Sequence, residues 1–86
     1  MNVIESRRTR IDIFAAILES ALEGSRKTRI MYRANVNQRD LTTILDLLIK
    51  KGLLEVSKNK SSSIYKATVK GRNFIESYRK LNETLS

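Results

Sequence analysis

The chain has 86 residues, of which 17 are Lys or Arg and nine are Asp or Glu, so its formal net charge is +8. A chain of this length has room for one small hydrophobic core, so we expect a single domain over residues 1–86. Cysteine and histidine are both absent, which excludes a disulfide framework, a zinc finger, a thiolate nucleophile and an imidazole base. We therefore predict no catalytic residues, no metal site and no cofactor.

The strong positive charge indicates an anionic partner, because a polyanion relieves the self-repulsion of so small a basic protein. Nucleic acid is the first candidate, and an anionic membrane surface is the second. No segment approaches the roughly 20 apolar residues that span a bilayer, and residues 1–10 lack the apolar stretch of a signal peptide. We expect a cytoplasmic protein with no membrane partner and no small-molecule ligand.

The first predicted helix spans about residues 8–23, where apolar residues recur at spacings of three and four. Gly24 can adopt the left-handed backbone of a helix C-terminus, so Gly24 and Ser25 are expected to end the helix. The apolar residues that we expect on its buried face are Ile11, Phe14, Ala15, Leu18, Ala21 and Leu22.

A short helix, a turn and a longer helix are predicted next. Thr28 can cap the short helix with its hydroxyl. The inner face of that helix consists of Ile30, Met31 and Ala34. Residues 35–37 form the turn, and Asn37, followed three positions later by Asp40, resembles the start of a helix over about residues 38–51. The inner face of this helix consists of Leu41, Ile44, Leu45 and Leu48. Its outer face consists of Arg39, Thr42, Thr43, Asp46 and Lys50.

Two strands and a last helix complete the predicted elements. Residues 53–58 and 64–68 read as strands, and the polar run 59–63 between them is expected to form a hairpin tip. Thr68 can cap a last helix over about residues 69–85. This order predicts an α+β winged helix-turn-helix, with a three-helix core, a two-stranded β-hairpin wing and a C-terminal helix.

A fold of this kind places its second motif helix in the major groove of duplex DNA, whose width admits one helix. We predict that residues 38–50 enter the groove and that the wing, residues 57–66, contacts the backbone or the minor groove. The candidate base-reading residues are Gln38, Arg39, Thr42 and Thr43. Arg39 ranks first, because a guanidinium can pair with a guanine edge. Asp46 is expected to lie beyond the contact or to pair with Lys50. The alternative for the whole set is an ordinary solvated helix face.

Basic residues around that helix are predicted to contact the DNA backbone, which fixes the register without reading sequence. They are Arg26, Lys27, Arg29, Arg33, Lys50, Lys58, Lys60 and Lys66. A generic solubilising surface is the alternative for any one of them. Met31 and Tyr32 are assigned to packing rather than to binding. Arg7, Arg8 and Arg10 read either as a basic arm or as the frayed start of the first helix.

The last helix carries an apolar seam that has two interpretations. The seam consists of Phe74, Tyr78, Leu81 and Leu85, and it forms either a dimer interface or the cover of the domain's own core. Each large apolar side chain buried there contributes about 1.5 to 3 kcal/mol, and the last two lie too far along one helix to reach the same core. We therefore favour a homodimer through this helix, with Ile75 turned toward the core.

The chain resembles the archaeal winged helix-turn-helix proteins, which include small, basic, dimeric DNA-binding proteins, in two runs: KTRIMYRANVNQRDLTTILDLLIKKGLLEV and IYKATVKGRNFIESYRKL. The resemblance covers about residues 13–81. It places residues 28–32 in the first motif helix, residues 51–54 at the end of the recognition helix and residues 68–71 at the start of the last helix. It implies binding to double-stranded DNA and an antiparallel coiled coil of last helices. The last helix of this sequence, which stops at Ser86, is shorter than in the best-known members.

We therefore predict a double-stranded DNA-binding protein that regulates transcription at the nucleoid. The alternatives are a less selective, chromatin-like protein, a protein-interaction module built on the same fold, and an RNA-binding protein. Catalysis is not predicted, because Asp12, Glu19, Asp40 and Asp46 are spread along the helices rather than paired.

Overall fold

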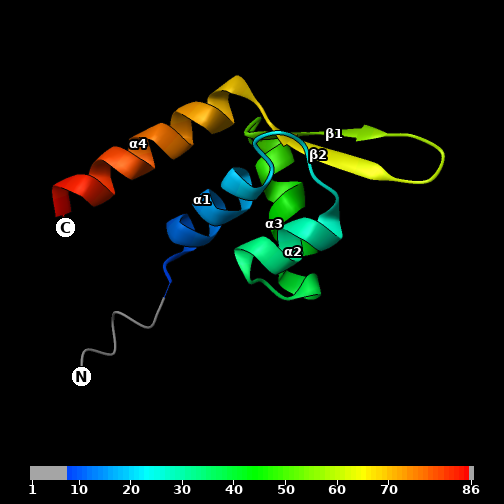
Figure 1. Ribbon diagram of the computed structural model, residues 1–86, viewed down its shortest axis with the longest axis horizontal. Helices are drawn as coiled ribbons and strands as arrows, with labels where there is room; N and C mark the ends of the chain where they lie inside the picture. The colour runs from blue at the N-terminus through cyan, green and yellow to red at the C-terminus, as the bar shows by residue number, and fades with distance from the viewer. Residues whose placement is uncertain (1–7, 86) are drawn as a thin grey trace.

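The computed structural model describes residues 8–85, which form four helices and one two-stranded antiparallel sheet. The elements are α1 (Arg10–Ser20), α2 (Lys27–Ala34), α3 (Gln38–Lys50), β1 (Leu54–Lys58), β2 (Ser63–Ala67) and α4 (Val69–Leu85). Figure 1 shows α1, α2 and α3 gathered together, while α4 and the tip of the hairpin extend to opposite sides. This is the predicted α+β order of three helices, a hairpin wing and a last helix.

The hydrophobic core lies between the first three helices, the base of the hairpin and the start of α4. The largest fully buried side chains are Ile17, Leu18, Ile30, Leu41, Leu45, Leu48, Leu54 and Ile75. On α3, three of the four predicted inner residues are buried, and Ile44 is half-buried against the core. Ile75 turns from α4 into the core, as predicted.

α1 is shorter than the predicted span of residues 8–23. Thr9 caps it: the Thr9 hydroxyl oxygen accepts from the backbone N–H of Asp12 at 3.1 Å, and the Asp12 carboxylate accepts from the backbone N–H of Thr9 at 2.8 Å. At the other end, the Ser25 hydroxyl donates to the Ser20 carbonyl at 2.8 Å. The helix ends at Ser20 because that carbonyl is used by a side chain rather than by a further helical turn.

The buried surface of α1 is wider than the predicted stripe. Ile11, expected in the core, is 54% exposed, whereas Ile17, which the stripe omitted, is fully buried. The reason is that α1 packs against α2, α4 and β2 together, so a helix predicted to bury one face buries two. The remaining stripe residues are buried or half-buried: Phe14, Ala15, Leu18, Ala21 and Leu22.

α2 begins one residue before its predicted cap. Arg26 is the N-cap residue and makes no side-chain capping bond, so the prediction that Thr28 caps the helix is wrong. Thr28 already has helical backbone, whereas an N-cap residue is extended. Met31 is half-buried against the core, as predicted. Tyr32, also assigned to packing, is 76% exposed, because it lies on the face of α2 opposite the buried residues.

The turn between α2 and α3 is fixed by side chains on both sides. Asn35 ends α2 in the left-handed region, with φ 55° and ψ 53°. Asn37 caps α3 as predicted, and its side-chain oxygen accepts from the backbone N–H of Asp40 at 2.8 Å. Arg8 donates from Nη1 to the Ala34 carbonyl at 2.6 Å and from Nη2 to the Asn35 carbonyl at 2.7 Å. A residue that precedes α1 therefore binds the end of α2.

The hairpin differs from the predicted strands by one residue at the start of each strand and at the end of the second. Leu54 lies opposite Ala67, and Lys58 lies opposite Ser63. At the tip, the Asn59 side-chain oxygen accepts from the backbone N–H groups of the two serines at positions 61 and 62, at 3.1 and 2.9 Å. The polar tip that the sequence predicted is therefore closed by one asparagine.

Thr68 joins the wing to α4. Its hydroxyl donates to the Gly52 carbonyl at 2.6 Å and accepts from the backbone N–H of Gly71 at 3.1 Å, so it caps α4 as predicted. A Cβ at Gly71 would lie 2.2 Å from the carbonyl oxygen of Leu53. The first turn of α4 therefore packs directly on the backbone that leads into β1.

Two side-chain contacts hold α4 on α1. The Tyr78 hydroxyl donates to the Asp12 carboxylate, and Arg79 Nη2 lies 2.8 Å from Glu19 Oε2. The hydrogen bond from Tyr78, followed by those from Thr9, holds the pKa of Asp12 below its ordinary value of 3.8. The same bond raises the pKa of the Tyr78 hydroxyl, so both groups favour the bonded form.

Asp12 is therefore expected to stabilise the fold at neutral pH and to lose that effect in acid. Because its folded-state pKa is the lower one, the contribution is fully present above about pH 5 and disappears as the pH falls below about 4. Urea unfolding of the wild type and of Asp12→Asn should show the wild-type advantage shrinking as the pH falls. Asp46→Asn, at an exposed residue of α3 that forms no ion pair within residues 8–85, serves as the control. A difference that stayed constant down to about pH 2.5 would contradict the coupling.

Candidate nucleic-acid interface

The four predicted base-reading residues are all exposed on α3. They are Gln38, Arg39, Thr42 and Thr43. The opposite side of the helix is packed into the core through its leucines, so rotation of the helix about its axis would expose apolar surface. The exposed row is thus held outward by burial of the inner face.

The two threonine hydroxyls of this row already have partners on the protein. Thr42 Oγ1 donates to the Gln38 carbonyl at 2.9 Å, and Thr43 Oγ1 lies 3.5 Å from the Arg39 carbonyl. Lys27 Nζ, at the start of α2, also donates to Thr42 Oγ1. Bonding back to the helix in this way is common for threonine. It leaves the Thr42 methyl as the group best suited to meet a base, and a thymine methyl is its natural partner.

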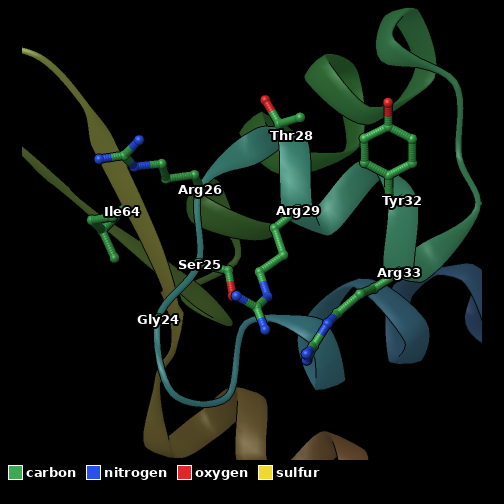
Figure 2. A pocket seen from close by; sticks show the side chains of 8 residues that line it. All are labelled: Gly24, Ser25, Arg26, Thr28, Arg29, Tyr32, Arg33 and Ile64. Carbon is green, nitrogen blue, oxygen red and sulfur yellow. The ribbon is translucent and has the colours of Figure 1, made fainter.

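The four basic residues on and before α2 divide between two sides of that helix. Lys27 reaches α3, whereas Arg29 and Arg33 extend together toward the loop that carries Ser25, as Figure 2 shows. Arg26 extends separately, toward the side of Ile64. The four charges are neighbours in the sequence, but the winding of the helix distributes them to different sides of α2.

The three arginines line an open cavity of about 650 Å³ between α2 and the wing. Its lining consists of Gly24, Ser25, Arg26, Thr28, Arg29, Tyr32, Arg33 and Ile64 (Figure 2). None of these residues is acidic, and within residues 8–85 none of the three guanidinium groups forms an ion pair. The cavity itself therefore carries an excess of positive charge, although Arg29 and Arg33 also line a neighbouring cavity that contains Glu19 and Glu23.

The three predicted wing lysines are exposed but do not share one face. Successive strand residues point to opposite sides. Lys58 therefore shares a face with the buried Leu54, whereas Lys66 shares a face with Ile64. Lys60 belongs to the tip between the strands. A flat surface laid against one side of the wing would meet only one of the two strand lysines.

Asp46 and Lys50 are both exposed near the end of α3, but among the described residues no ion pair joins them. Of the two alternatives for Asp46, pairing with Lys50 is therefore wrong; an exposed ion pair contributes little free energy, so its absence costs the fold little. Lys50 therefore keeps its charge free at the C-terminal end of the α3 face.

The N-terminal arginines act in the framework of the fold. Arg8 binds the end of α2, and the Arg10 guanidinium lies 5.5 Å from the centre of the Phe14 ring. Arg7 lies outside the described residues. Of the two interpretations of this segment, a free basic arm does not describe Arg8 or Arg10.

The apolar seam of α4 is divided along its length. Phe74 and Tyr78 are half-buried, and Phe74 packs against the core. Leu81 and Leu85, one and two turns further on, are 56% and 76% exposed. Phe74, Tyr78 and Leu81 line a shallow groove of about 170 Å³ together with the exposed Ile11. The first half of the seam covers the chain's own core, and the second half is uncovered.

Residues 7–86 match the family described as winged helix-turn-helix. The chain belongs to the winged helix-turn-helix family.

Several winged helix-turn-helix proteins are similar to this one. Sso10a-2, described as a DNA-binding protein from Sulfolobus solfataricus, has 32% identity and a TM-score of 0.78, covering 91% of this chain and 85% of its own. An uncharacterised protein of Methanocaldococcus jannaschii is 31% identical over 81 residues, which is 93% of this chain and 79% of that protein. F93 from STIV, a winged-helix DNA-binding protein, is 16% identical, with a TM-score of 0.70 over 92% of this chain and 95% of its own. The last likeness concerns the fold alone, and the first two confirm the resemblance to archaeal members.

Across residues 8–85 of this winged helix-turn-helix protein, no helix is both long and apolar enough to cross a bilayer. The same residues hold no group of three acidic side chains placed to bind a metal ion.

At the candidate interface of this winged helix-turn-helix protein, two contacts had no signal in the sequence. They are the bond from Lys27 to Thr42 and the pair of bonds from Arg8 to the end of α2. Each joins residues 15 or more positions apart, and no helical or strand periodicity reaches that far. For Arg8 the sequence offers one general hint: the last carbonyls of a helix, here those at the end of α2, attract positively charged side chains.

Proposed function

We propose that this protein binds double-stranded DNA by inserting α3 into the major groove. The observation that carries the proposal is the exposed polar row on α3, which is held outward by the buried leucines of the same helix. Arg39 is the residue that we assign to a guanine edge, and Gln38 suits an adenine edge. The net charge of +8 and the similarity to Sso10a-2, itself described as a DNA-binding protein, support this role. No catalytic step is part of the proposal.

Lysines beside α3 are proposed as the main contacts to the DNA backbone. Lys27 lies against Thr42, next to the base-reading row, and Lys50 lies at the far end of the same helix. The wing contributes Lys60 from its tip and either Lys58 or Lys66, depending on which face meets the duplex. Three further contacts are proposed at the outer edge of the interface, on and before α2: Arg26, Arg29 and Arg33.

Because α3 carries side chains able to read bases, we favour a regulator of transcription over a protein that coats DNA uniformly. Such a regulator would act in the cytoplasm, at the nucleoid. The fold of α3 presents Gln38 and Arg39 in its first turn, where the recognition helix of this motif contacts base edges. A chromatin-like protein needs phosphate contacts only. The two roles differ in how strongly the protein discriminates between DNA sequences.

Titration of nucleic acids of equal length tests the proposal. We expect a DNA duplex to bind more tightly than either a DNA single strand or an RNA duplex, because the major groove of A-form RNA is too narrow for a helix. Fluorescence anisotropy with labelled duplex DNA, single-stranded DNA and duplex RNA gives the three affinities. If duplex RNA bound as tightly as duplex DNA, insertion of α3 would be rejected. It would also be rejected if the protein bound no DNA and instead formed a complex with another protein that nuclease treatment left intact.

Two single substitutions separate base reading from backbone contact. Arg39→Ala should weaken a preferred duplex by about tenfold or more and random DNA by less, because a bidentate pair to guanine discriminates by about 1 to 3 kcal/mol. Lys60→Ala should weaken both equally. A duplex selected from a random pool provides the preferred site, and Lys80→Ala on α4 is the matched control. The reverse pattern would exchange the two roles.

We propose that two copies associate through the C-terminal half of α4. Leu81, Leu85 and Ile11 are large apolar side chains left exposed along one side of α1 and α4. Covering each would contribute about 1.5 to 3 kcal/mol. Sedimentation equilibrium of the wild type should give twice the chain mass, and Leu81→Gln should shift the equilibrium to the monomer. A wild type that stays monomeric at about 100 μM has an association free energy weaker than about −5.5 kcal/mol, and that result would contradict this interface.

A further inference from the structure

A pair of linked hydrogen bonds fastens α4 to the N-terminus of α1. The Tyr78 hydroxyl donates to Asp12 Oδ1. The other oxygen of the same carboxylate, Oδ2, accepts from the backbone N–H of Thr9 at 2.8 Å, and the Thr9 hydroxyl oxygen accepts from the backbone N–H of Asp12 at 3.1 Å. One carboxylate thus both caps α1 and holds α4, and it fixes the backbone of Thr9.

The residue next to this cap fastens the turn before α3. Arg8, directly preceding Thr9, donates through both terminal nitrogens to the carbonyls of Ala34 and Asn35, at 2.6 and 2.7 Å. These are carbonyls at the end of α2 that lack helical partners. A guanidinium forms strong charge-assisted bonds to them and places positive charge at the negative end of the helix dipole.

The turn at Asn35 needs this support. Asn35 is the one non-glycine residue with positive φ within residues 8–85, and a side chain in that region costs free energy that neighbouring contacts must offset. Two residues later Asn37 caps α3. The conformation of Asn35 therefore sets where α3 begins and how it is aimed.

We propose that Tyr78, Asp12 and Arg8 are positioning residues that couple the packing of α4 to the placement of α3. None of the three is assigned a contact with DNA. The line of bonds runs from α4, which carries the proposed subunit contact, through the cap of α1 to the turn before the groove-reading helix. Loss of the Tyr78 bond leaves the capping box in place but removes the bond that holds the Asp12 carboxylate from its other oxygen. The cap is then held less firmly, and Arg8 and the turn relax with it. The inference rests on the proposed function, because one of its measurements is DNA affinity.

The chain offers matched controls for each end of this line. Arg79 also joins α4 to α1, through Glu19, but that pair lies at the opposite end of α1 from the cap. Arg10 is a second arginine beside the same cap; its guanidinium lies over Phe14, and although Arg10 lines the same cavity as Asn35, it is not one of the groups bonded to the turn. Variants Arg79→Gln and Arg10→Gln therefore remove similar groups without removing a hydrogen bond of the line.

The first test needs no DNA. Amide resonances of residues 34–40 are compared in the folded wild type, Tyr78→Phe and Arg79→Gln, with urea unfolding as the check that each variant folds. Tyr78→Phe keeps the ring and loses only the hydroxyl, so we expect it to shift the turn resonances, whereas Arg79→Gln leaves them in place. Unchanged turn resonances in Tyr78→Phe would overturn the proposal, even if the variant were less stable.

The second test measures duplex affinity in a two-residue cycle. We expect Tyr78→Phe and Arg8→Gln each to weaken binding about fivefold or more, and the double variant to be close to Arg8→Gln alone, because one line carries both effects. Arg10→Gln sets the effect of losing one nearby charge. Independent effects, with the double variant weakened by the product of the two single changes, would overturn the coupling.

The salt dependence distinguishes positioning from contact. If Arg8 touched a phosphate, Arg8→Gln would lower the log-log salt slope by about 0.9, whereas a positioning residue leaves the slope unchanged. Arg8→Lys keeps the charge but loses one of the two bonds, so it should not restore full affinity. Complete rescue by lysine, together with a reduced slope in Arg8→Gln, would assign Arg8 to the DNA backbone and reject the proposal. A wild type that binds no duplex would reject the proposed function, while the resonance test would still decide the coupling.

Discussion

Raising the salt concentration from about 50 to 200 mM is expected to weaken binding to duplex DNA by a thousandfold or more, as for proteins that make six to ten phosphate contacts. Seven basic residues are proposed to contact the backbone at once, because only one of the two strand lysines of the wing can face the duplex, and each neutralised phosphate releases bound cations. The logarithm of the association constant should fall linearly with the logarithm of the salt concentration, at about −0.9 per contact. Anisotropy titrations in a KCl series measure this slope.

The contribution of the wing to the salt slope can be measured by replacing its lysines. In a triple variant, Lys58, Lys60 and Lys66 are each replaced by glutamine. The magnitude of the salt slope should then fall by at most about 2.7, and by about 1.8 if only one strand lysine contacts the duplex. The single variants Lys58→Gln and Lys66→Gln then identify the face of the hairpin that meets DNA. Lys80→Gln, on α4, is the control. Binding that did not change with salt would remove the electrostatic basis of the interface.

Gly71→Ala is expected to destabilise the fold strongly, because Gly71 is buried in the first turn of α4. A methyl group there would lie 2.2 Å from the Leu53 carbonyl oxygen, so the start of α4 must move off the backbone that leads into the wing. Such overpacking costs about 3 kcal/mol, offset by about 1 kcal/mol from the higher helix propensity of alanine. The net loss should lower Tm by roughly 8 to 16 °C.

Asn73→Ala is the matched control for this substitution, because it adds alanine to the same helix at an exposed position. Circular dichroism during thermal unfolding should show it unchanged or slightly more stable. An unchanged Tm in Gly71→Ala would show that α4 does not need to sit against Leu53. The two variants together therefore report whether α4 is an integral part of the fold or an appended helix.

Local signals in the sequence were sufficient for the order of the elements. The leucine spacing of residues 41–48, the cap at Asn37 and the cap at Thr68 each act within a few residues, and the structure contains all three. Errors occurred where another segment supplied the partner. Ile17 was missed because α1 is covered from more than one side. Thr28 is a separate case, a local error in which the N-cap lies two residues earlier, at Arg26.

The candidate interface was predictable in part for the same reason. Exposure of Arg39 and its neighbours follows from helical periodicity alone, and the structure agrees. The division of the α2 charges, with Lys27 on α3 and the arginines around the cavity, depends on how α2 crosses α3. The separation of Lys58 from Lys66 depends on the strand register.

The amino-acid sequence by itself determined the winged helix-turn-helix order of helices and strands, the polar face of α3 and the excess of positive charge, because periodicity, caps and composition are properties of short segments. Only the tertiary structure decided that Arg8 binds the turn before α3 and that Tyr78 binds the cap of α1. Those outcomes depend on which distant groups meet when the core closes. Burial of the core fixes the helices relative to one another, and the polar side chains then bond to whatever lies within reach.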